Sequence, residues 1–330
     1  MIYTVTFSPA IDYLMYLDTV KVGTIQRSAR EAIYFSGKGI NVSKVMKTLG
    51  VETTVLGFLA GFTGRAIADE LLSCGIACDF CFLPEGNTRI NVKLRHGEAG
   101  SYTTAISGST LNIDISTKSG TETDINAQGP DVPEASLEEL YGKIEMLSAD
   151  DVLIVSGSAQ RSLPRDVYQT VLLKASERGA RTVLDADGEL FRNGLKARPF
   201  LVKPNREELA ALLGHSVDTD RKVLAAVREV QEMGARNVLV SLGADGAIFV
   251  SESGDAYRMG VAKGTCVNSI GAGDSMLAGF LSKYLTGGSI EDALLTGTAA
   301  GAATAFSEGL ATREDIEAIR KKIRAPRRIS

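Results

Sequence analysis

Short β-rich runs alternate with amphipathic helical stretches over most of this 330-residue chain, and this alternation limits its fold more than any other feature. The strand candidates are residues 3–7, 53–58, 152–156, 182–184, 200–202, 238–241 and 247–250. The helix candidates are residues 40–49, 64–74, 136–146, 165–178, 206–213, 221–233, 274–284, 290–306 and 313–323. Such alternation predicts an α/β fold with a mainly parallel sheet covered by helices on both faces.

Two segments, residues 12–36 and 88–126, break this rhythm. Both read as successive β segments with little helical periodicity. We expect them to form a small separate sheet lying over one end of the main sheet. Within the second segment, residues 97–121 are rich in Gly, Ser and Thr, which predicts a long hairpin or a mobile loop. Such an excursion could change closure, oligomer contacts or substrate choice, or have no function.

Composition narrows the choice of partners and location. With 44% hydrophobic and 23% charged residues, the chain can bury a large core. The net charge is −4 with Lys and Arg dispersed, so no nucleic-acid partner is indicated. No apolar run reaches the ~18 residues of a membrane span, and the first residues read as a strand rather than a leader sequence. We therefore expect a cytoplasmic protein without a membrane or nucleic-acid partner.

The few cysteines and histidines exclude several kinds of site. Cys78 and Cys81 have the spacing of half a zinc or redox site, but no second pair completes it. We interpret the four cysteines as small hydrophobic side chains. Because His96 and His215 are the only histidines, a Ser-His-Asp hydrolase and a multi-histidine metal site are excluded.

Residues 266–279, CVNSIGAGDSMLAG, carry the strongest chemical signal. An extended approach runs into glycines, and helical periodicity begins at or just before Asp274. The first amides of such a helix have no partners within it and attract anions, and glycines let an anion approach closely. A carboxylate among them is a candidate general base beside an anion hole. An Asp that simply favours a helix start explains the same residues equally well.

A second glycine cluster, GKGIN at residues 37–41, opens the first predicted helix. It places a cation and an amide side chain at a helix start, which suits a polyol or a phosphorylated sugar. The spacing of a Walker P-loop is absent, and neither cluster matches the dinucleotide fingerprint G-x-G-x-x-G. The alternative is a glycine turn needed only for tight packing of strand against helix.

Taken together, GKGIN and NSIGAGDSMLAG resemble the two signatures of the PfkB carbohydrate kinases, a ribokinase-like family. Ser36 departs from the Ala or Gly usual before the first signature. The resemblance continues through residues 6–12, 88–91, 121–130, 156–158, 203–209 and 241–247. Within the family, the residues and spacing of these motifs are most similar to the bacterial 1-phosphofructokinase branch, with tagatose-6-phosphate kinase as a near relative.

The resemblance implies a fold and a reaction. The fold would be a ribokinase-like three-layer α/β/α sandwich, a mainly parallel central sheet with a small β-sheet lid. Residues 1–11, 37–87 and 127–330 would form the kinase domain, and residues 12–36 and 88–126 the lid over the sugar site. The reaction would be phosphoryl transfer from ATP, with Mg²⁺, to a ketohexose monophosphate. Fructose 1-phosphate is the leading substrate, tagatose 6-phosphate the alternative.

In this family pattern Asp274 would accept the proton of the attacking hydroxyl. The amides of Gly271, Ala272 and Gly273 would stabilise charge on the transferring phosphoryl group. We expect the helix-start amides to lower the pKa of Asp274, which makes it a positioning base rather than a strong one.

The sugar contacts implied by the family are Asp12, Gly37, Gly39, Asn41 and Asn91. A phosphorylated sugar also needs a cationic clamp, because a phosphate must be neutralised. The cations assigned to this clamp are Lys38, Arg89 and Arg27. Ser8 stands where this branch usually has Asn, which makes that contact uncertain.

The nucleotide and metal residues implied by the family lie in two segments. Glu208, the last residue of the N-x-x-E element that begins at Asn205, would organise Mg²⁺, and Lys203 would lie near the ATP phosphates. The alternative for KPNREEL is an ordinary helix start with a capping Asn. The remaining nucleotide contacts would be Ser241, Gly243, Gly246 and Ser307. A tight hairpin explains SLGADG almost as well.

Two rival functions remain at this point. A non-catalytic sugar-phosphate sensor with a kinase fold would lack the base or the anion hole, and both are present. A dehydrogenase lacks support because the dinucleotide fingerprint is missing. The expected partners are a sugar phosphate and ATP, and a homodimer formed through the lid is left open.

Overall fold

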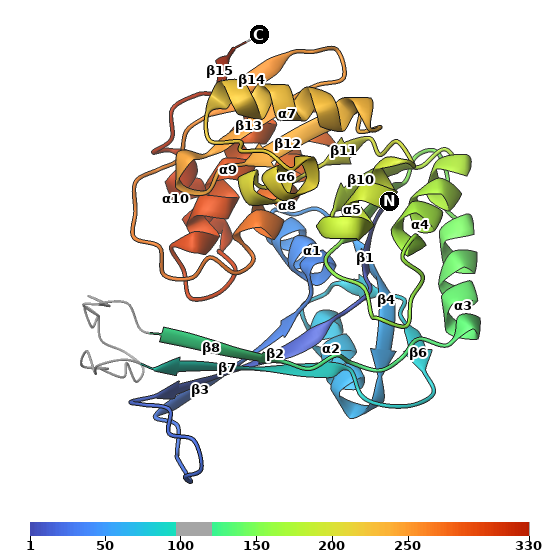
Figure 1. Cartoon of the computed structure of the whole chain (residues 1–330), viewed down its shortest axis with the longest axis vertical. Coiled ribbons are helices and arrows are strands. Elements are labelled where there is room, and N and C mark those ends of the chain that lie inside the picture. Colours follow the sequence, from blue (N-terminus) through green and yellow to red (C-terminus); the bar gives the residue numbers. More distant parts are fainter. Residues whose placement is uncertain (97–120, 330) are drawn as a thin grey trace.

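The computed structural model describes residues 1–96 and 121–329 (Figure 1). The main sheet has the strand order β15-β14-β13-β12-β11-β10-β9-β1-β4-β5, with β6 also paired to β4. Its strands are β1 (Ile2–Thr6), β4 (Thr54–Ala60), β5 (Ala77–Cys78), β6 (Cys81–Leu83), β9 (Val152–Ser156), β10 (Arg181–Asp185), β11 (Leu201–Val202), β12 (Asn237–Ser241), β13 (Ala247–Val250), β14 (Ala256–Met259) and β15 (Arg327–Arg328). Pairing is parallel from β5 to β12 and antiparallel from β12 to β15.

Helices cover both faces of this sheet. One face packs on α3 (Glu134–Glu145), α4 (Val167–Glu177), α5 (Gly188–Leu195), α6 (Arg206–Leu213) and α7 (Asp220–Glu232). The other packs on α1 (Lys38–Thr48), α2 (Gly61–Ser73), α8 (Ala272–Tyr284), α9 (Ile290–Ala305) and α10 (Arg313–Arg320). Alternate side chains of strand β9 point to opposite faces of the sheet, and both faces are apolar. Leu153 and Val155 belong to the core on the first face, and Val152 and Ile154 belong to the core on the second. The predicted three-layer α/β/α architecture is confirmed.

A second, smaller sheet leaves the main sheet at its carboxyl edge (Figure 1). Its strand order is β3-β2-β7-β8, and its strands are β2 (Ala10–Leu17), β3 (Arg30–Ser36), β7 (Arg89–His96) and β8 (Thr121–Asn126). Strand β2 begins shortly after β1 ends, and β3 ends directly before α1. Strands β2 and β3 are therefore an insertion between the first strand and the first helix of the main fold, and β7 and β8 are a second insertion between β6 and α3.

The small sheet turns one face inward. On β2, Asp12 and Leu14 are buried, and on β7, Asn91 and Lys93 are buried. Asp12 pairs with Asn91 in the parallel β2–β7 register. Because side chains alternate along a strand, these residues share a face. Polar groups thus gather on the side of the small sheet that the rest of the chain covers.

Each predicted strand and helix overlaps an observed one, with ends that differ by a few residues. The described elements not predicted are α5, the 3₁₀ helix η1 (Gly243–Asp245) and the short strands β5, β6, β14 and β15. Helix α5 spans only two turns, and β5 and β15 have two residues each, too few for a periodic pattern. The predicted excursion at 97–121 lies, apart from Thr121, outside the described residues. In the part of the chain that is described, no helix is long and apolar enough to cross a membrane.

Candidate active site

Helix α8 begins at the glycine-rich stretch, close to the predicted position. Gly271, at the N-cap, has a φ of 78°, in the left-handed region that favours glycine. A Cβ on Gly273 would lie 3.2 Å from the Lys203 Nζ, so an ammonium group sits against the first turn. The Ala272 N–H donates to the Ser269 carbonyl at 3.2 Å. Of the three amides predicted to form the anion hole, the Ala272 amide is therefore already hydrogen-bonded to the backbone.

Asp274 is buried in the first turn of α8, with 5% of its surface exposed. Its Oδ2 accepts a hydrogen bond from the Asn41 Nδ2 at 2.8 Å. Burial, followed by repulsion from Asp185, raises the pKa of Asp274 from 3.8 to about 6, although Asn41, Lys38 and Lys203 oppose the rise. The expectation of a lowered pKa was wrong, because loss of hydration outweighs the stabilising groups.

Asp185 ends strand β10 and is the main residue that sequence reasoning missed. Its carboxylate is fully buried, 3.2 Å from the Lys203 Nζ and 3.8 Å from the Lys38 Nζ. Neither oxygen has a partner in hydrogen-bond geometry among the described residues, so these contacts are ion pairs only. Its position at the carboxyl end of a parallel strand, where α/β proteins bind ligands, was the available signal.

Lys38 is the first residue of α1 and its side chain passes over Gly157. A Cβ on Gly157, whose φ is 99°, would lie 3.5 Å from the Lys38 Cβ. Burial acts to lower the pKa of Lys38, but Asp185, Asp274 and other carboxylates together raise it. Lys38 is thus directed toward the carboxylates at the sheet edge.

Glu208 and Asn205 form a capping box at the start of α6. The Asn205 Oδ1 accepts from the Glu208 N–H at 2.7 Å, and the Glu208 Oε2 accepts from the Asn205 N–H at 2.8 Å. This segment therefore forms the ordinary helix start with a capping Asn that the sequence offered as the alternative to a metal site. Burial raises the pKa of Glu208. The hydrogen bond from Asn205 and the charge of Lys203 oppose this rise, whereas the charge of Asp185 adds to it. Glu208 consequently belongs electrostatically to the same group of charges as Asp185.

These carboxylates fit Mg²⁺ bound together with phosphate. Among the described residues no cluster of three His, Cys, Asp or Glu side chains could hold a metal alone. Mg²⁺ usually keeps several waters and takes one or two carboxylates plus substrate phosphates. Asp185 is buried without a hydrogen-bond partner among the described residues, and its charge also acts on Glu208, so these two carboxylates meet that requirement.

At the small sheet, Asp12 is held on both oxygens. Its Oδ2 accepts from the Ser36 Oγ at 2.6 Å, and its Oδ1 accepts from the Asn91 Nδ2 at 2.7 Å. The Asn91 Oδ1 is buried without a hydrogen-bond partner among the described residues. Asp12 lines an open pocket between the small sheet, α1 and the approach to α8, with a volume of about 520 Å³ when the solvent at its mouth is included. Further side chains lining it include Ser36, Asn41, Lys44, Lys93 and Asn268.

Two cations of this cavity were not predicted. The Lys44 Nζ donates to the Phe35 carbonyl at 3.1 Å, and burial lowers the pKa of Lys44. The Lys93 Nζ lies 2.7 Å from the Asp124 Oδ2. Lys44 follows Asn41 at helical spacing, and Lys93 follows Arg89 on the same face of β7. Those spacings were the signals that could have identified them.

The predicted cationic clamp is not assembled in this structure. The Arg89 Nη2 donates to the Ser8 carbonyl at 3.2 Å, and burial lowers the pKa of Arg89 while Asp12 opposes that effect. Lys38 instead faces Asp185. Arg27 is exposed in the loop between β2 and β3.

Gly37 and Gly39 have a packing role against β1. A Cβ on Gly37, whose φ is 145°, would lie 2.5 Å from the Thr6 Cγ2, and one on Gly39 would lie 2.5 Å from the Thr6 Oγ1. The Thr6 Oγ1 also accepts a hydrogen bond from the Ile40 N–H at 3.1 Å. The glycines let α1 start directly on the strand, as the packing alternative requires, and this places Asn41 within reach of Asp274.

The predicted nucleotide residues lie around the same sheet edge. Ser241 ends β12, and its N–H donates to the Pro204 carbonyl at 3.0 Å, next to Lys203. Gly243 and Gly246 have φ values of 56° and 96° in a tight turn, where a Cβ on Gly246 would lie 2.2 Å from the Met259 carbonyl oxygen. The Ser307 Oγ donates to the Ala303 carbonyl at 2.8 Å. The turn glycines are thus required by backbone geometry.

Cations, first-turn amides and a buried carboxylate meeting at the carboxyl edge of a parallel sheet are the features of an enzyme that transfers phosphoryl groups. The chain belongs to the pfkB family of carbohydrate kinases, whose family model it matches over residues 5–119 and 109–317. It is 35% identical over 328 residues to the 1-phosphofructokinase of Bacillus subtilis (strain 168), covering 99% of this chain and 100% of the relative.

Two further relatives agree with this assignment. The D-tagatose-1-phosphate kinase of Bacillus licheniformis is 35% identical over 311 residues, which cover 94% of each chain. A crystal structure of a phosphofructokinase-like protein from Staphylococcus aureus is 37% identical, with a TM-score of 0.84, covering 100% of this chain and 99% of that one. The predicted family, kinase activity and ribokinase-like fold are therefore confirmed.

Proposed function

We propose that this sugar-phosphate kinase transfers the γ-phosphoryl group of ATP to the 6-hydroxyl of fructose 1-phosphate, giving fructose 1,6-bisphosphate and ADP. The observation that carries the proposal is the Asp274 carboxylate, buried in the first turn of α8 beside the Lys203 ammonium and bonded to Asn41. A hydroxyl placed there meets a base and an anion-binding helix start together.

The second candidate substrate is D-tagatose 1-phosphate. The similar proteins are named 1-phosphofructokinase and D-tagatose-1-phosphate kinase, and both names place the phosphate on carbon 1. They support a ketohexose 1-phosphate, the class of the leading sequence prediction, over tagatose 6-phosphate, which was the alternative. The two sugars differ only in the configuration at carbon 4.

In the proposed mechanism Asp274 accepts the proton of the attacking hydroxyl. With its pKa raised to about 6, the carboxylate is ionised at neutral pH yet more basic than an ordinary aspartate. The amides of Gly271 and Gly273 at the start of α8 and the Lys203 ammonium stabilise the charge on the transferring phosphoryl group, and the Ala272 amide would join them only on leaving the Ser269 carbonyl.

Asp185 and Glu208 are the residues that would hold Mg²⁺. Bound with ATP, the ion would supply positive charge to the phosphate oxygens. Lys38 and Lys203, held now by Asp185, would orient those oxygens. ATP itself would extend along the carboxyl edge toward Asn205, Ser241, Gly243, Gly246 and Ser307.

We propose that the small sheet acts as a lid, with residues 12–36 and 88–126 forming one unit and the rest of the chain the kinase domain. Asp12, Asn91, Gly37, Gly39 and Asn41 would bind the sugar at the open pocket between the lid, α1 and the approach to α8. Arg27 is exposed in the loop between β2 and β3. In a homodimer formed through the lids, Arg27 of one chain could contribute to the active site of the other. Sedimentation equilibrium would test the dimer, and fractionation of source cells would test the proposed cytoplasmic location.

A sugar-phosphate-binding protein without catalysis is the candidate from another class. ADP release measured with fructose 1-phosphate, tagatose 1-phosphate, tagatose 6-phosphate, fructose 6-phosphate and ribose separates these functions. The kinase proposal expects turnover that is fastest with a ketohexose 1-phosphate. Binding of the sugar phosphate without ADP release would favour the sensor, and turnover only with fructose 6-phosphate or ribose would refute the proposed substrate.

A further inference from the structure

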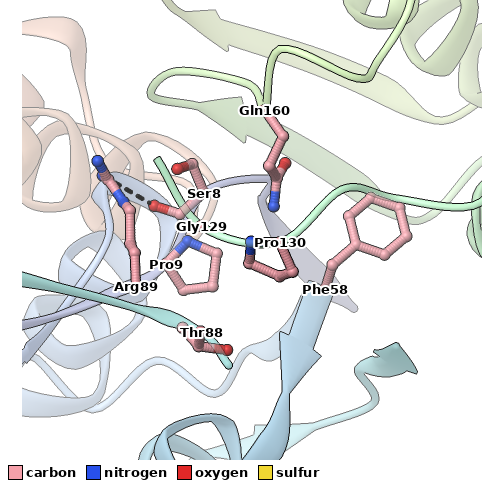
Figure 2. A pocket seen from close by; sticks show the side chains of 8 residues that line it. All are labelled: Ser8, Pro9, Phe58, Thr88, Arg89, Gly129, Pro130 and Gln160. Atoms are coloured by element: carbon pink, nitrogen blue, oxygen red, sulfur yellow. Dashed lines mark hydrogen bonds between the residues drawn. The ribbon is translucent and has the colours of Figure 1, made fainter. Parts of the chain in front are cut away.

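The small sheet is attached to the rest of the chain at two separate places. At its base, the Arg89 Nη2 donates to the Ser8 carbonyl at 3.2 Å, close to the end of β1 (Figure 2). At the second place, Arg30 at the start of β3 contacts Glu308, which follows α9 and is 278 positions away in the sequence. In the small sheet Arg89 pairs with residue 10 of β2 and Arg30 with residue 16, so about 20 Å of strand separates the two attachments.

Arg30 and Glu308 form an ion pair with two hydrogen bonds. The Arg30 Nη1 donates to the Glu308 Oε1 at 3.1 Å, and the Nη2 donates to the Oε2 at 2.6 Å. Two parallel bonds fix the orientation of both planar groups, which a single contact does not. The Arg30 guanidinium also lies 5.0 Å from the centre of the Tyr16 ring on the neighbouring strand β2. Tyr16 thus supports Arg30 on the small sheet while Arg30 binds Glu308.

Tyr34 supplies a second contact between the same two segments. It pairs with Asp12 in the β2–β3 register and is four residues from Arg30, so the three side chains share one face of the small sheet. A Cβ on Gly309 would lie 3.4 Å from the Tyr34 Cε1. Tyr34, Glu308 and Gly309 all line the open pocket together with Asp12. The ion pair therefore joins the two sides of this pocket.

Glu308 is also linked to the helix start that carries Asp274. The Asn268 Nδ2 donates to the Glu308 carbonyl at 2.9 Å, and the Asn268 Oδ1 accepts from the Ile270 N–H at 3.1 Å. Ile270 directly precedes Gly271, the N-cap of α8. The small sheet is thus connected through Glu308 to the turn beside the proposed site of transfer.

We propose that Glu308 is a positioning residue that holds the small sheet, through Arg30, against the approach to α8 while a sugar is bound. It keeps Asp12 and Asn91 directed toward Asp274 and does not touch the reacting atoms. The inference rests on the proposed function, because it assumes that the sugar binds between the small sheet and α8.

The exposure of this ion pair suits a contact that opens to admit the sugar and closes behind it. The side chains of Arg30 and Glu308 are 49% and 43% exposed. Water replaces most of the interaction when exposed charges separate, so such a pair shifts an equilibrium by about three- to fivefold. That is enough to hold the small sheet in place without trapping the product.

The test compares Arg30→Met and Glu308→Gln with the wild-type enzyme. Each change removes the ion pair but keeps a side chain of similar length. The KM for fructose 1-phosphate is expected to rise about three- to fivefold, because part of the binding energy must then hold the small sheet. The kcat at saturation and the KM for ATP should stay within about twofold of wild type.

The double variant Arg30→Met with Glu308→Gln shows whether the two residues act through each other. If they do, its KM rises no further than that of the more affected single variant. If Glu308 instead binds the sugar itself, the two effects multiply to about tenfold or more, and the inference is overturned.

Arg236 and Glu252 provide a matched control at the opposite end of β12 from Ser241. The Arg236 Nε and Nη2 donate to the two Glu252 oxygens at 2.6 and 3.0 Å, and the side chains are 46% and 51% exposed. Arg236→Met and Glu252→Gln remove an ion pair of the same kind but should leave the KM for fructose 1-phosphate within about twofold. A KM raised equally by these changes would show a general effect of stability and overturn the inference.

Hydrogen exchange separates this inference from the proposed function. The amides of residues 30–36, measured without substrate, should exchange faster in Arg30→Met and Glu308→Gln than in the wild type or the control variants. If exchange is faster but fructose 1-phosphate is not a substrate, the proposed substrate is wrong and the role of Glu308 is supported. If turnover is as proposed but neither exchange nor KM changes, the kinase function stands and the inference is refuted.

Discussion

Replacing Asp274 by Asn is expected to abolish turnover and, at the same time, to stabilise the fold at neutral pH. The wild-type carboxylate is buried with its pKa raised from 3.8 to about 6. That rise corresponds to about 3 kcal/mol of folding free energy that the ionised form costs. Asparagine keeps the shape and an acceptor for Asn41 but carries no charge, so this cost disappears.

The sign of the pH dependence follows from linkage. Because the folded pKa is above the unfolded one, the native state binds more protons, and stability from this group is full below pH 3.8 and lost as pH rises through about 6. The variant should therefore exceed the wild type in free energy of unfolding by about 3 kcal/mol at pH 8 and by roughly half of that at pH 5.

Urea denaturation of both proteins at the two pH values measures this difference. Asp218→Asn serves as a control of opposite sign, since Lys222 lowers the pKa of the exposed Asp218 and its loss should not stabilise the fold. An Asp274→Asn variant that is less stable than wild type at pH 8, or a gain that does not change with pH, would refute the assigned burial cost. Turnover above about 1% of wild type would refute the role as base.

Four further outcomes are expected. Asp185→Asn should move the acidic limb of the kcat/KM profile below pH 6, because removing a like charge lowers the pKa of Asp274; a limb that stays in place would contradict the coupling. Glu208→Gln keeps an oxygen for the capping box, so it should raise the Mg²⁺ concentration needed for half-maximal rate without lowering the melting temperature. Asn205→Ala removes the cap and should lower the free energy of unfolding by about 1 kcal/mol, measured by urea denaturation. Arg89→Ala should raise the KM for fructose 1-phosphate more than tenfold with kcat little changed, and an unaltered KM would remove Arg89 from the phosphate site.

The architecture could be predicted because its signals are local and repeated. Strand–helix alternation defined the layers, and the two segments without helical periodicity are the ones whose described strands form the small sheet. Helix α5 was missed because two turns give too few positions for a periodic pattern. The start of α8 was predictable from glycines followed by an apolar stripe.

The site was predictable only where a motif carries it. Asp274 and Asn41 stand in the two glycine clusters, and they are hydrogen-bonded although 233 positions separate them. Asp185 stands in no such motif, and only the parallel pairing of β10 with β9 and β11 brings it between Lys38 and Lys203. The pKa of Asp274 was predicted with the wrong sign because burial, which outweighs the helix start, is a property of packing.

The charges at the sheet edge explain how Asp185 is tolerated, although it is fully buried and has no hydrogen-bond partner among the described residues. Its ion pairs with Lys203 and Lys38 offset part of the cost of burial, and removing one partner of such a pair is expected to cost about 3–5 kcal/mol. Incoming phosphate oxygens would compete for the same two lysines, and a divalent cation bound with them would compete for Asp185. Substrate binding would then exchange one set of ion pairs for another without leaving a buried charge unpaired. Such an edge favours a divalent cation bound together with a polyphosphate over a neutral sugar alone.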